Sequence, residues 1–180
     1  MSSSIEMPPG AIIIRPGTEA DAAAFRVLRL EALRTHPEAF GSDFETNDKL
    51  PLSHWADRLQ ALGSESMIYF AEHDRHLIGI CGIGRGHMKK IRHSATIFSV
   101  YVQPQWRGNH IAKSLIEHCI EWARAQSILI VKLAVITTNT SAIRCYARCG
   151  FSVYGVEPQV INADGVLYDE LLMMRKLEVG

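Results

Sequence analysis

Apolar and polar positions along the chain recur with two periods, which divide the sequence into strand-like and helix-like segments. Short β-branched or apolar runs bounded by turn-forming residues predict strands. Apolar residues at helical spacing, between capping residues and a closing Gly or Pro, predict helices. The predicted strands are Ala11–Arg15, Met67–His73, Leu77–His87, His93–Val102, Ile128–Thr137, a segment near Phe151–Glu157, and Val166–Lys176. The predicted helices extend from Thr18 to Pro37, from Ser53 to Gly63, from about Asn109 to Ala125 and from about Ser141 to Arg148.

This order of elements predicts the fold class. Strand, two helices, three strands, helix, strand, helix and two strands favour an α/β (α+β) fold, with a mixed central sheet of about seven strands and helices on both faces. The three strands between Met67 and Val102 form an antiparallel meander, and Phe40–Leu50 is a polar, acidic loop. In a chain of 180 residues we expect one domain, residues 11–178, after a flexible tail, residues 1–10.

Composition narrows the function classes. Nineteen Lys and Arg balance nineteen Asp and Glu, so the protein has no net positive charge that would attract nucleic acid or an anionic membrane surface. The most apolar stretch, Ile128–Ile136, is far shorter than the ~20 residues of a membrane-spanning helix. The first residues do not resemble a secretory or transit peptide. We therefore expect a cytoplasmic protein.

The cysteines, histidines and glycines form no familiar disulfide, metal-binding or dinucleotide-binding pattern. The cysteines, Cys81, Cys119, Cys145 and Cys149, lack a CxxC pair and are expected to be reduced thiols. The eight histidines form no helical pair with metal-ligand spacing, so no metal is expected. Four glycines between Gly79 and Gly86 lie within one predicted strand, which favours bulges or close backbone contacts over a dinucleotide fingerprint.

The most informative segment is Val100–Lys113, where an apolar strand ends at a proline, passes an Arg-Gly turn and enters a helix. The first backbone N–H groups of a helix have no internal partners, and together with the helix dipole they favour a phosphate. Gly108 allows close approach of the backbone, while Arg107 and Lys113 add positive charge. The pattern is typical both of a phosphate site and of an ordinary strand-turn-helix connection with basic surface residues.

The same segment resembles motif A of the GNAT superfamily, the Gcn5-related N-acetyltransferases. That motif is Arg or Gln, two residues, Gly, one residue, then Gly or Ala; here it reads from Arg107 to Ala112, with His110 at the usual first glycine. The segment from Asn139 to Phe151 is similar to motif B, with an Asn, a helical tyrosine at Tyr146, and Gly-Phe before the next strand. The order of strands and helices also resembles this family across nearly the whole chain.

The resemblance implies an enzyme that transfers an acetyl group from acetyl-CoA to a primary amine of a small molecule or protein, by direct attack in a ternary complex. It implies that backbone groups of Val100, Tyr101 and Val102 pair with the pantetheine arm and that Asn139 contacts the cofactor near its reactive end. Tyr146 would be the general acid for the departing thiolate. The implied pyrophosphate turn comprises Arg107, Gly108, Asn109, His110, Ile111, Ala112 and Lys113. The His110 side chain would either crowd the pyrophosphate or hydrogen-bond it.

The general base is not specified by these motifs. An alkylamine with a pKa near that of lysine, about 10.4, must lose a proton before attack, so a carboxylate, a histidine or a water chain is needed. His93 opens the central strand, where proteins of the resembled family often carry histidine. Glu45, in the acidic loop, is a second candidate base. Together with Asp169 and Glu170 on the last strand, Glu45 is also a candidate for lining the amine site.

Three points stay open at the level of sequence. The sequence does not distinguish between a polyamine, an aminoglycoside-like drug, an amino acid and a protein amine as the acceptor, although the acidic loop favours cationic acceptors. The chain could also be a non-catalytic acyl-CoA-binding or sensing module with a GNAT fold. A homodimer is possible, since dimers are common among the proteins that this chain resembles.

Overall fold

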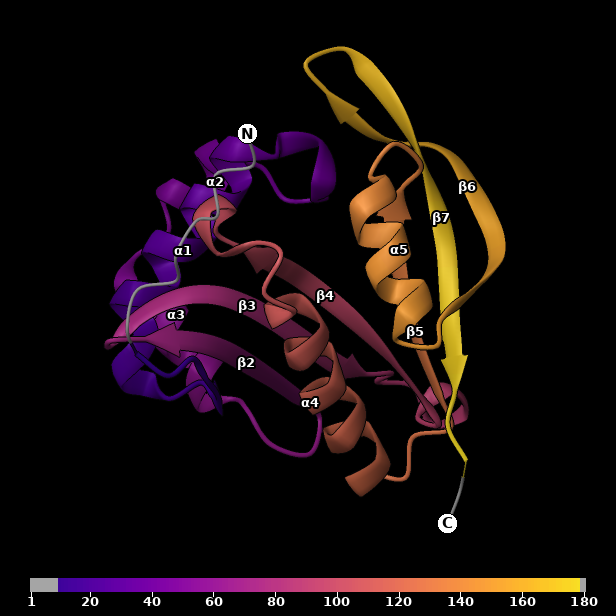
Figure 1. Ribbon diagram of the computed structural model, residues 1–180, viewed down its shortest axis with the longest axis horizontal. Coiled ribbons are helices and arrows are strands. Elements are labelled where there is room, and N and C mark those ends of the chain that lie inside the picture. The colour runs from indigo at the N-terminus through magenta and orange to yellow at the C-terminus, as the bar shows by residue number, and fades with distance from the viewer. Residues whose placement is uncertain (1–9, 179–180) are drawn as a thin grey trace, which may run out of the picture.

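The structure is a computed structural model that describes residues 10–178. The expected flexible tail therefore lies outside the described residues, apart from Gly10. Seven strands form one sheet, as the sequence pattern predicted, and their order in it is β1-β2-β3-β4-β5-β7-β6 (Figure 1). The strands are β1 (Ile13–Pro16), β2 (Ser66–His73), β3 (His76–Arg85), β4 (Ser94–Val102), β5 (Ile130–Ile136), β6 (Ser152–Ala163) and β7 (Val166–Lys176). The helices are α1 (Ala22–Thr35), α2 (Phe44–Asp48), α3 (Leu52–Gln60), α4 (Ile111–Ala125) and α5 (Thr140–Arg148), with short 3-10 turns η1 (Glu19–Asp21), η2 (Pro37–Ala39), η3 (Lys89–Ile91) and η4 (Pro104–Trp106).

The sheet is mixed, as expected. Strands β1 to β4 pair antiparallel, and so do β5, β7 and β6, while β4 and β5 pair in parallel. Helix α4 provides the crossover that a parallel pair requires. The parallel pairing is short, because only Ser94–Thr96 of β4 and Ile130–Lys132 of β5 are in register.

Two apolar cores lie on opposite faces of the sheet. Helices α1 and α3 cover one face, where Phe25 and Trp55 meet edge to face with ring centroids 5.0 Å apart over Phe70. Helices α4 and α5 cover the other face, where Leu115 and Ile120 are fully buried (Figure 1). Alternating side chains of the strands supply both cores, which is why nearly continuous apolar runs are found in β3 and β5.

The entry into α1 follows from its first residues. The Thr18 N–H donates a hydrogen bond to Asp21 Oδ2 at 2.8 Å, as in a capping box. The guanidinium of Arg15 on β1 donates two further hydrogen bonds to the same carboxylate, at 2.7 and 2.8 Å. This network fixes the N-terminal end of α1 against the first strand.

Two segments differ from the sequence-based expectation. The predicted loop Phe40–Leu50 contains a short helix, α2, because the Asp43 side chain accepts the Thr46 N–H at 2.7 Å and caps it. Strand β6 runs on to Ala163 rather than ending near Glu157. Pro158 does not end it because β6 is the edge strand, where a residue without an N–H is tolerated.

The glycines of β3 permit close backbone contacts, as the sequence indicated. A Cβ at Gly82 would overlap the ring of Phe98 on the neighbouring strand, and the pairing of β3 with β4 shifts register between Ile80 and Gly82. Within residues 10–178, no helix has the length and apolar character that spanning a membrane requires.

Candidate acyl-transfer site

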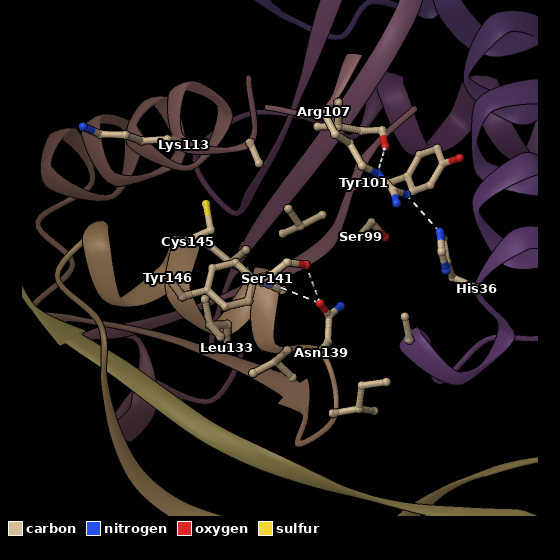
Figure 2. Close-up of a pocket in the computed structure, with 18 of the residues that line it drawn as sticks. His36, Ser99, Tyr101, Arg107, Lys113, Leu133, Asn139, Ser141, Cys145 and Tyr146 are labelled. Atoms are coloured by element: carbon tan, nitrogen blue, oxygen red, sulfur yellow. Dashed lines mark hydrogen bonds between the residues drawn. The ribbon is translucent and has the colours of Figure 1, made fainter. Parts of the chain in front are cut away.

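A cavity opens where β4 and β5 separate. Their pairing ends at Thr96 and Lys132, and beyond these residues the two strands diverge (Figure 1). The residues that follow, Ile97–Val102 and Leu133–Ile136, line opposite walls of a cavity of about 660 Å³. Figure 2 shows this cavity, with Ser99 and Tyr101 on one side and Leu133 on the other. This volume lies within the ~300–1,000 Å³ typical of small-molecule sites. The β4 backbone groups that point toward β5 here have no sheet partner, so they can pair with an extended ligand that carries amides.

The strand β4 is itself distorted beside the cavity. Ser99 has a φ of 55°, in the left-handed region that a serine seldom adopts. The register shift between β3 and β4 lies opposite this residue. The distortion turns the C-terminal half of β4 away from β5, and this creates the space between them.

The N-terminus of α4 forms one end of the cavity. Gly108 and His110 both have left-handed backbones, with φ of 86° and 59°. His110 is the N-cap residue, and its carbonyl accepts the first helical hydrogen bond from Ser114 at 3.0 Å. The N–H groups of Ile111, Ala112 and Lys113 therefore begin the helix without internal partners, beside the cavity that these residues line. This arrangement suits a phosphate group.

The Arg107 side chain is held by two neighbours. Its Nε donates to the Val102 carbonyl at 3.0 Å, and its Nη2 donates to His36 Nε2 at 2.9 Å (Figure 2). Because a guanidinium only donates, His36 Nε2 must accept. A neutral His36 therefore carries its proton on Nδ1, which lies 3.6 Å from Glu38 Oε1. Arg107 thus connects the end of β4 to the loop after α1.

Helix α5 supplies the opposite wall. Asn139 caps it, with Oδ1 accepting the Ala142 N–H at 3.1 Å and the Ser141 hydroxyl at 3.0 Å. Tyr146 is 8% exposed and directs its ring into the cavity (Figure 2). Burial, together with the nearby cysteine thiols, raises the pKa of Tyr146 well above its ordinary value. The phenol therefore keeps its proton at neutral pH and is available as a donor.

Comparison with known proteins agrees with this geometry. The model of the acetyltransferase (GNAT) family matches residues 25–151, more than half of the chain. The chain belongs to the acetyltransferase (GNAT) family.

Individual GNAT relatives match over different shares of the chain. Streptothricin acetyltransferase of Escherichia coli is 36% identical over 75 residues, which are 38% of this chain and 43% of that enzyme. A GNAT-family acetyltransferase of Streptococcus pneumoniae has a TM-score of 0.83 at 24% identity, covering 93% of this chain and 100% of that one. The Salmonella typhimurium protein yncA, solved with its cofactor acetyl-CoA, has a TM-score of 0.80 at 23% identity, covering 93% and 95%. This chain spans about half the length of the first curated relatives that it matches.

Most residues that the GNAT resemblance singles out meet at the cavity. Those that line it are Val100, Tyr101, Val102, Arg107, Gly108, His110, Ile111, Ala112, Lys113, Asn139 and Tyr146. Asn109 lies in the same turn, but its side chain donates to the Trp106 carbonyl at 3.1 Å and does not line the cavity.

The residues that the sequence suggested as the general base or as the amine site do not line the cavity. His93 precedes β4 at the end remote from Val102, and Glu45 is exposed on α2; neither lines the cavity. The Asp169 carboxylate accepts the Gln159 N–H at 2.8 Å and so holds the irregular part of β6. Glu170 is paired in register with Ile136, a lining residue, and with Glu157 on β6. Burial and the charge of Glu157 raise the pKa of Glu170.

Sequence reasoning did not single out several residues that this GNAT fold brings to the cavity. His36 and Glu38 come from the loop after α1, and Cys145 and Arg148 come from α5. The only sequence signal for the first pair was Pro37, which lies between them and begins turn η2. The signal for Cys145 and Arg148 was their helical spacing from Ser141, which places the three residues on one face of α5.

Proposed function

We propose that this protein is an acetyl-CoA-dependent N-acetyltransferase that acetylates a primary amine by direct attack in a ternary complex. The observation that carries the proposal is the cavity between β4 and β5. It combines unpaired strand backbone, the N-terminus of α4 and a buried, protonated tyrosine in one continuous space. A chain with phosphates at one end, internal amides and a thioester at the other end fits these features: the phosphates suit the N-terminus of α4, the amides suit the strand backbone, and the thioester suits the tyrosine.

The residues present fit the acyl donor by their chemistry. Backbone groups of Val100, Tyr101 and Val102 would pair with the pantetheine amides as an added strand does. The N–H groups at the start of α4, with Lys113 nearby, would hold the pyrophosphate. Acetyl-CoA supplies the activated acyl group. A β4 N–H in the segment that ends at Val102 would donate to the thioester oxygen as negative charge develops there.

Tyr146 is proposed as the general acid. Its ring faces the cavity from α5, and its raised pKa keeps the phenol protonated at neutral pH, so a proton donor is in place when the thiolate departs. The proton moves from the phenol oxygen to the sulfur as the carbon–sulfur bond breaks. Asn139 holds the first turn of α5 and in this way positions the helix that carries Tyr146.

Glu38 is proposed as the group that removes the amine proton, directly or through a water. Of His93, Glu45 and Glu38, only Glu38 lines the cavity. The hydrogen bond from Arg107 to His36 Nε2 orients the protonated Nδ1 of His36 toward Glu38, with 3.6 Å between Nδ1 and Glu38 Oε1. His36 is thus proposed as a positioning residue. His93 and Glu45, the candidates from sequence, serve as comparison variants.

A cationic small-molecule amine is the proposed acceptor class. Turn η2, which carries Glu38, lies beside β5 and β6, where Glu157 and Glu170 face each other. A second positive charge on the acceptor would relieve the repulsion between these two carboxylates. The name of the Escherichia coli relative, a streptothricin acetyltransferase, supports testing antibiotic amines beside simple diamines.

The test is release of CoA from acetyl-CoA, followed by mass spectrometry over a panel of diamines, amino acids, antibiotics and peptide amines. Parent protein, Tyr146→Phe and Glu38→Gln are compared, with His93→Ala and Glu45→Gln as matched controls. We expect amine-dependent release that falls at least about 100-fold in the first two variants and little in the controls. Stabilisation by acetyl-CoA without release for any amine would instead favour a binding or sensing module.

A homodimer and a cytoplasmic location are the finer parts of this proposal. Apolar side chains are exposed along the outer part of the β6–β7 hairpin, at Val153, Tyr154, Val156, Val166 and Leu167. Such a patch on an edge strand suits a second copy. Light scattering of the parent and of Val156→Lys checks the dimer; a monomer at every concentration of the parent would exclude it. The reduced cysteines support the location, which fractionation of the source cells would check.

A further inference from the structure

One reactive side chain at the cavity has no part in the proposed acetyl transfer. Cys145 lies on α5 directly before Tyr146, is partly exposed, and lines the cavity. Its sulfur points into the space between Lys113 and Tyr146 (Figure 2). The other three cysteines, Cys81, Cys119 and Cys149, are buried. Among the cysteines, therefore, Cys145 is the one that a molecule entering the cavity meets.

The surroundings of Cys145 favour its thiolate and an anionic reagent. Lys113 on α4 and Arg148 on α5 both line the same cavity. The Cys149 thiol, one helical turn on, and these two positive charges lower the pKa of Cys145 to about 7. The same cations would attract phosphates or carboxylates of an incoming molecule.

A second observation concerns the polar side chain beside Cys145. Tyr146 is more than nine-tenths buried and aims into the cavity beside Cys145. Its hydroxyl takes part in none of the side-chain hydrogen bonds formed within residues 10–178. A sulfur or oxygen brought to Cys145 would therefore also find a free donor.

We propose that Cys145 is a thiol–disulfide exchange site for anionic low-molecular-weight disulfides, with coenzyme A disulfide as the preferred reagent. The preference for that disulfide rests on the proposed function, while the exchange rests on Cys145 and its neighbours. The thiol proton is lost to solvent, and the thiolate attacks one sulfur of the disulfide. The disulfide bond of the reagent breaks as the new sulfur–sulfur bond forms, and the other half leaves as a thiolate that takes up a proton. The reagent supplies the oxidising equivalent, so no further electrons are needed.

The consequence is a reversible block of the cavity. The bound half of the reagent occupies the space beside Tyr146 that the acyl donor needs. A dithiol reverses the step by the same exchange and releases the unmodified enzyme. Acetyl transfer would then depend on the redox state of the small thiols around the protein.

Two effects of different size should raise the rate of disulfide exchange at Cys145. A thiol with a pKa of about 7 is half ionised at neutral pH, against roughly 3% for an ordinary cysteine, but its lower basicity reduces its nucleophilicity. The net intrinsic gain is only about threefold by this reasoning. Electrostatic attraction of the reagent should add about tenfold or more. The decisive comparison is therefore between reagents of opposite charge.

The experiment treats the full chain with coenzyme A disulfide, glutathione disulfide or the cationic disulfide cystamine, and locates adducts by intact and peptide mass spectrometry. We expect one adduct, on Cys145, formed about ten times faster with coenzyme A disulfide than with cystamine. Acetyl-CoA should slow it, and a dithiol should remove it. Glutathione disulfide reacting equally fast would retain the site but overturn the preference for coenzyme A disulfide.

Variants keep the result interpretable. Cys145→Ser and Cys145→Ala should lose the adduct, whereas the buried-cysteine control Cys81→Ser should keep it, with thermal unfolding verifying that each is folded. Cys149→Ser should keep the adduct but slow its formation. Adducts on other cysteines, or equal rates with all three disulfides, would overturn the proposal. Acetyl transfer is assayed separately in reducing buffer, so selective modification of Cys145 without any transfer would refute the proposed function alone.

Discussion

Replacing His110 by glycine should stabilise this protein, although the imidazole lies at the proposed pyrophosphate site. His110 has a φ of 59° and a ψ of 10° at the N-cap of α4. For a residue with a Cβ, this left-handed conformation costs roughly 1–2 kcal/mol, a cost that glycine does not have. The His110 side chain forms no hydrogen bond with any residue that the structure describes. Little is therefore lost from the folded state with the imidazole.

The expected gain is smaller than the relieved strain. Glycine also makes the unfolded chain more flexible, which offsets about 0.4–1 kcal/mol. The net increase in the free energy of unfolding should be about 0.5–1 kcal/mol. For a chain of this length, that corresponds to a rise in Tm of about 1–4 °C.

Two matched variants separate strain from side-chain contacts. His110→Ala removes the imidazole but keeps the Cβ, so it should lie about 1 kcal/mol below His110→Gly. Gly108→Ala adds a Cβ where no atom lies within 4 Å but where φ is 86°, so it should lose about 1 kcal/mol through the backbone alone.

The assay is urea unfolding of the four proteins followed by circular dichroism, with acetyl-CoA affinity measured by calorimetry on each folded variant. His110→Gly should bind acetyl-CoA at least as tightly as the parent, because the helix N–H groups remain. If His110→Gly had the same free energy of unfolding as His110→Ala, backbone strain at this position would not determine the stability of the variants. Weaker binding by both variants would show that the imidazole itself contacts the ligand.

Three further predictions concern other parts of the molecule. Asp21→Asn should lower the free energy of unfolding by about 2 kcal/mol near pH 7; hydrogen bonds from Arg15 depress the pKa of Asp21, so this stability begins to decline below the unfolded pKa of about 3.9 and is lost as pH falls through the lower folded pKa, and urea unfolding at a series of pH values should find the difference between parent and variant constant above about pH 5 and shrinking below about pH 4. The raised pKa of Tyr146 predicts that kcat, measured by CoA release with the acceptor that the panel identifies, does not fall between pH 8 and 10; a descending limb in that range that is absent in Tyr146→Phe would contradict its role as a buried acid. Arg29 is 6% exposed, stacks on Phe40 with its guanidinium carbon 4.4 Å from the ring centroid, and has Nη1 without a partner among residues 10–178; burial lowers its pKa to about 10. Arg29→Met should therefore raise the free energy of unfolding by about 1 kcal/mol, measured by chemical denaturation. A loss of stability would show that the stacking on Phe40 outweighs the cost of burying the charge.

The elements that could be predicted are those whose signals are local. Apolar periodicity and turn residues located seven strands and the four longer helices, since each depends on neighbours within a few positions. The short helix α2 depends on one cap, Asp43, in an otherwise polar segment. The extension of β6 past Pro158 depends on the position of β6 at the edge of the sheet. Periodicity does not contain that information.

The acceptor side of the site could not be predicted because its contacts are distant in sequence. His36 meets Arg107 across 71 positions, and Glu38 lies beside the cavity only because turn η2, which begins at Pro37, packs next to β5 and β6. The motif residues, in contrast, lie in two short segments that each form one strand-turn-helix unit. The acyl-donor side therefore follows from local spacing, whereas the acceptor side requires the assembled sheet.

Backbone strain connects the fold to its proposed chemistry. Seven residues other than glycine have positive φ within residues 10–178. Asp74, Arg75 and Asp164 lie in hairpin turns, where such angles are expected. Ser99 and His110 have no turn to explain them, and both line the cavity. Ser99 separates β4 from β5, and His110 exposes the first N–H groups of α4, so each creates one of the features that the acyl donor needs. Replacing either residue by glycine should keep that feature with less strain, whereas a substitution that pushes Ser99 into an extended backbone should close the cavity by restoring the pairing of β4 with β5.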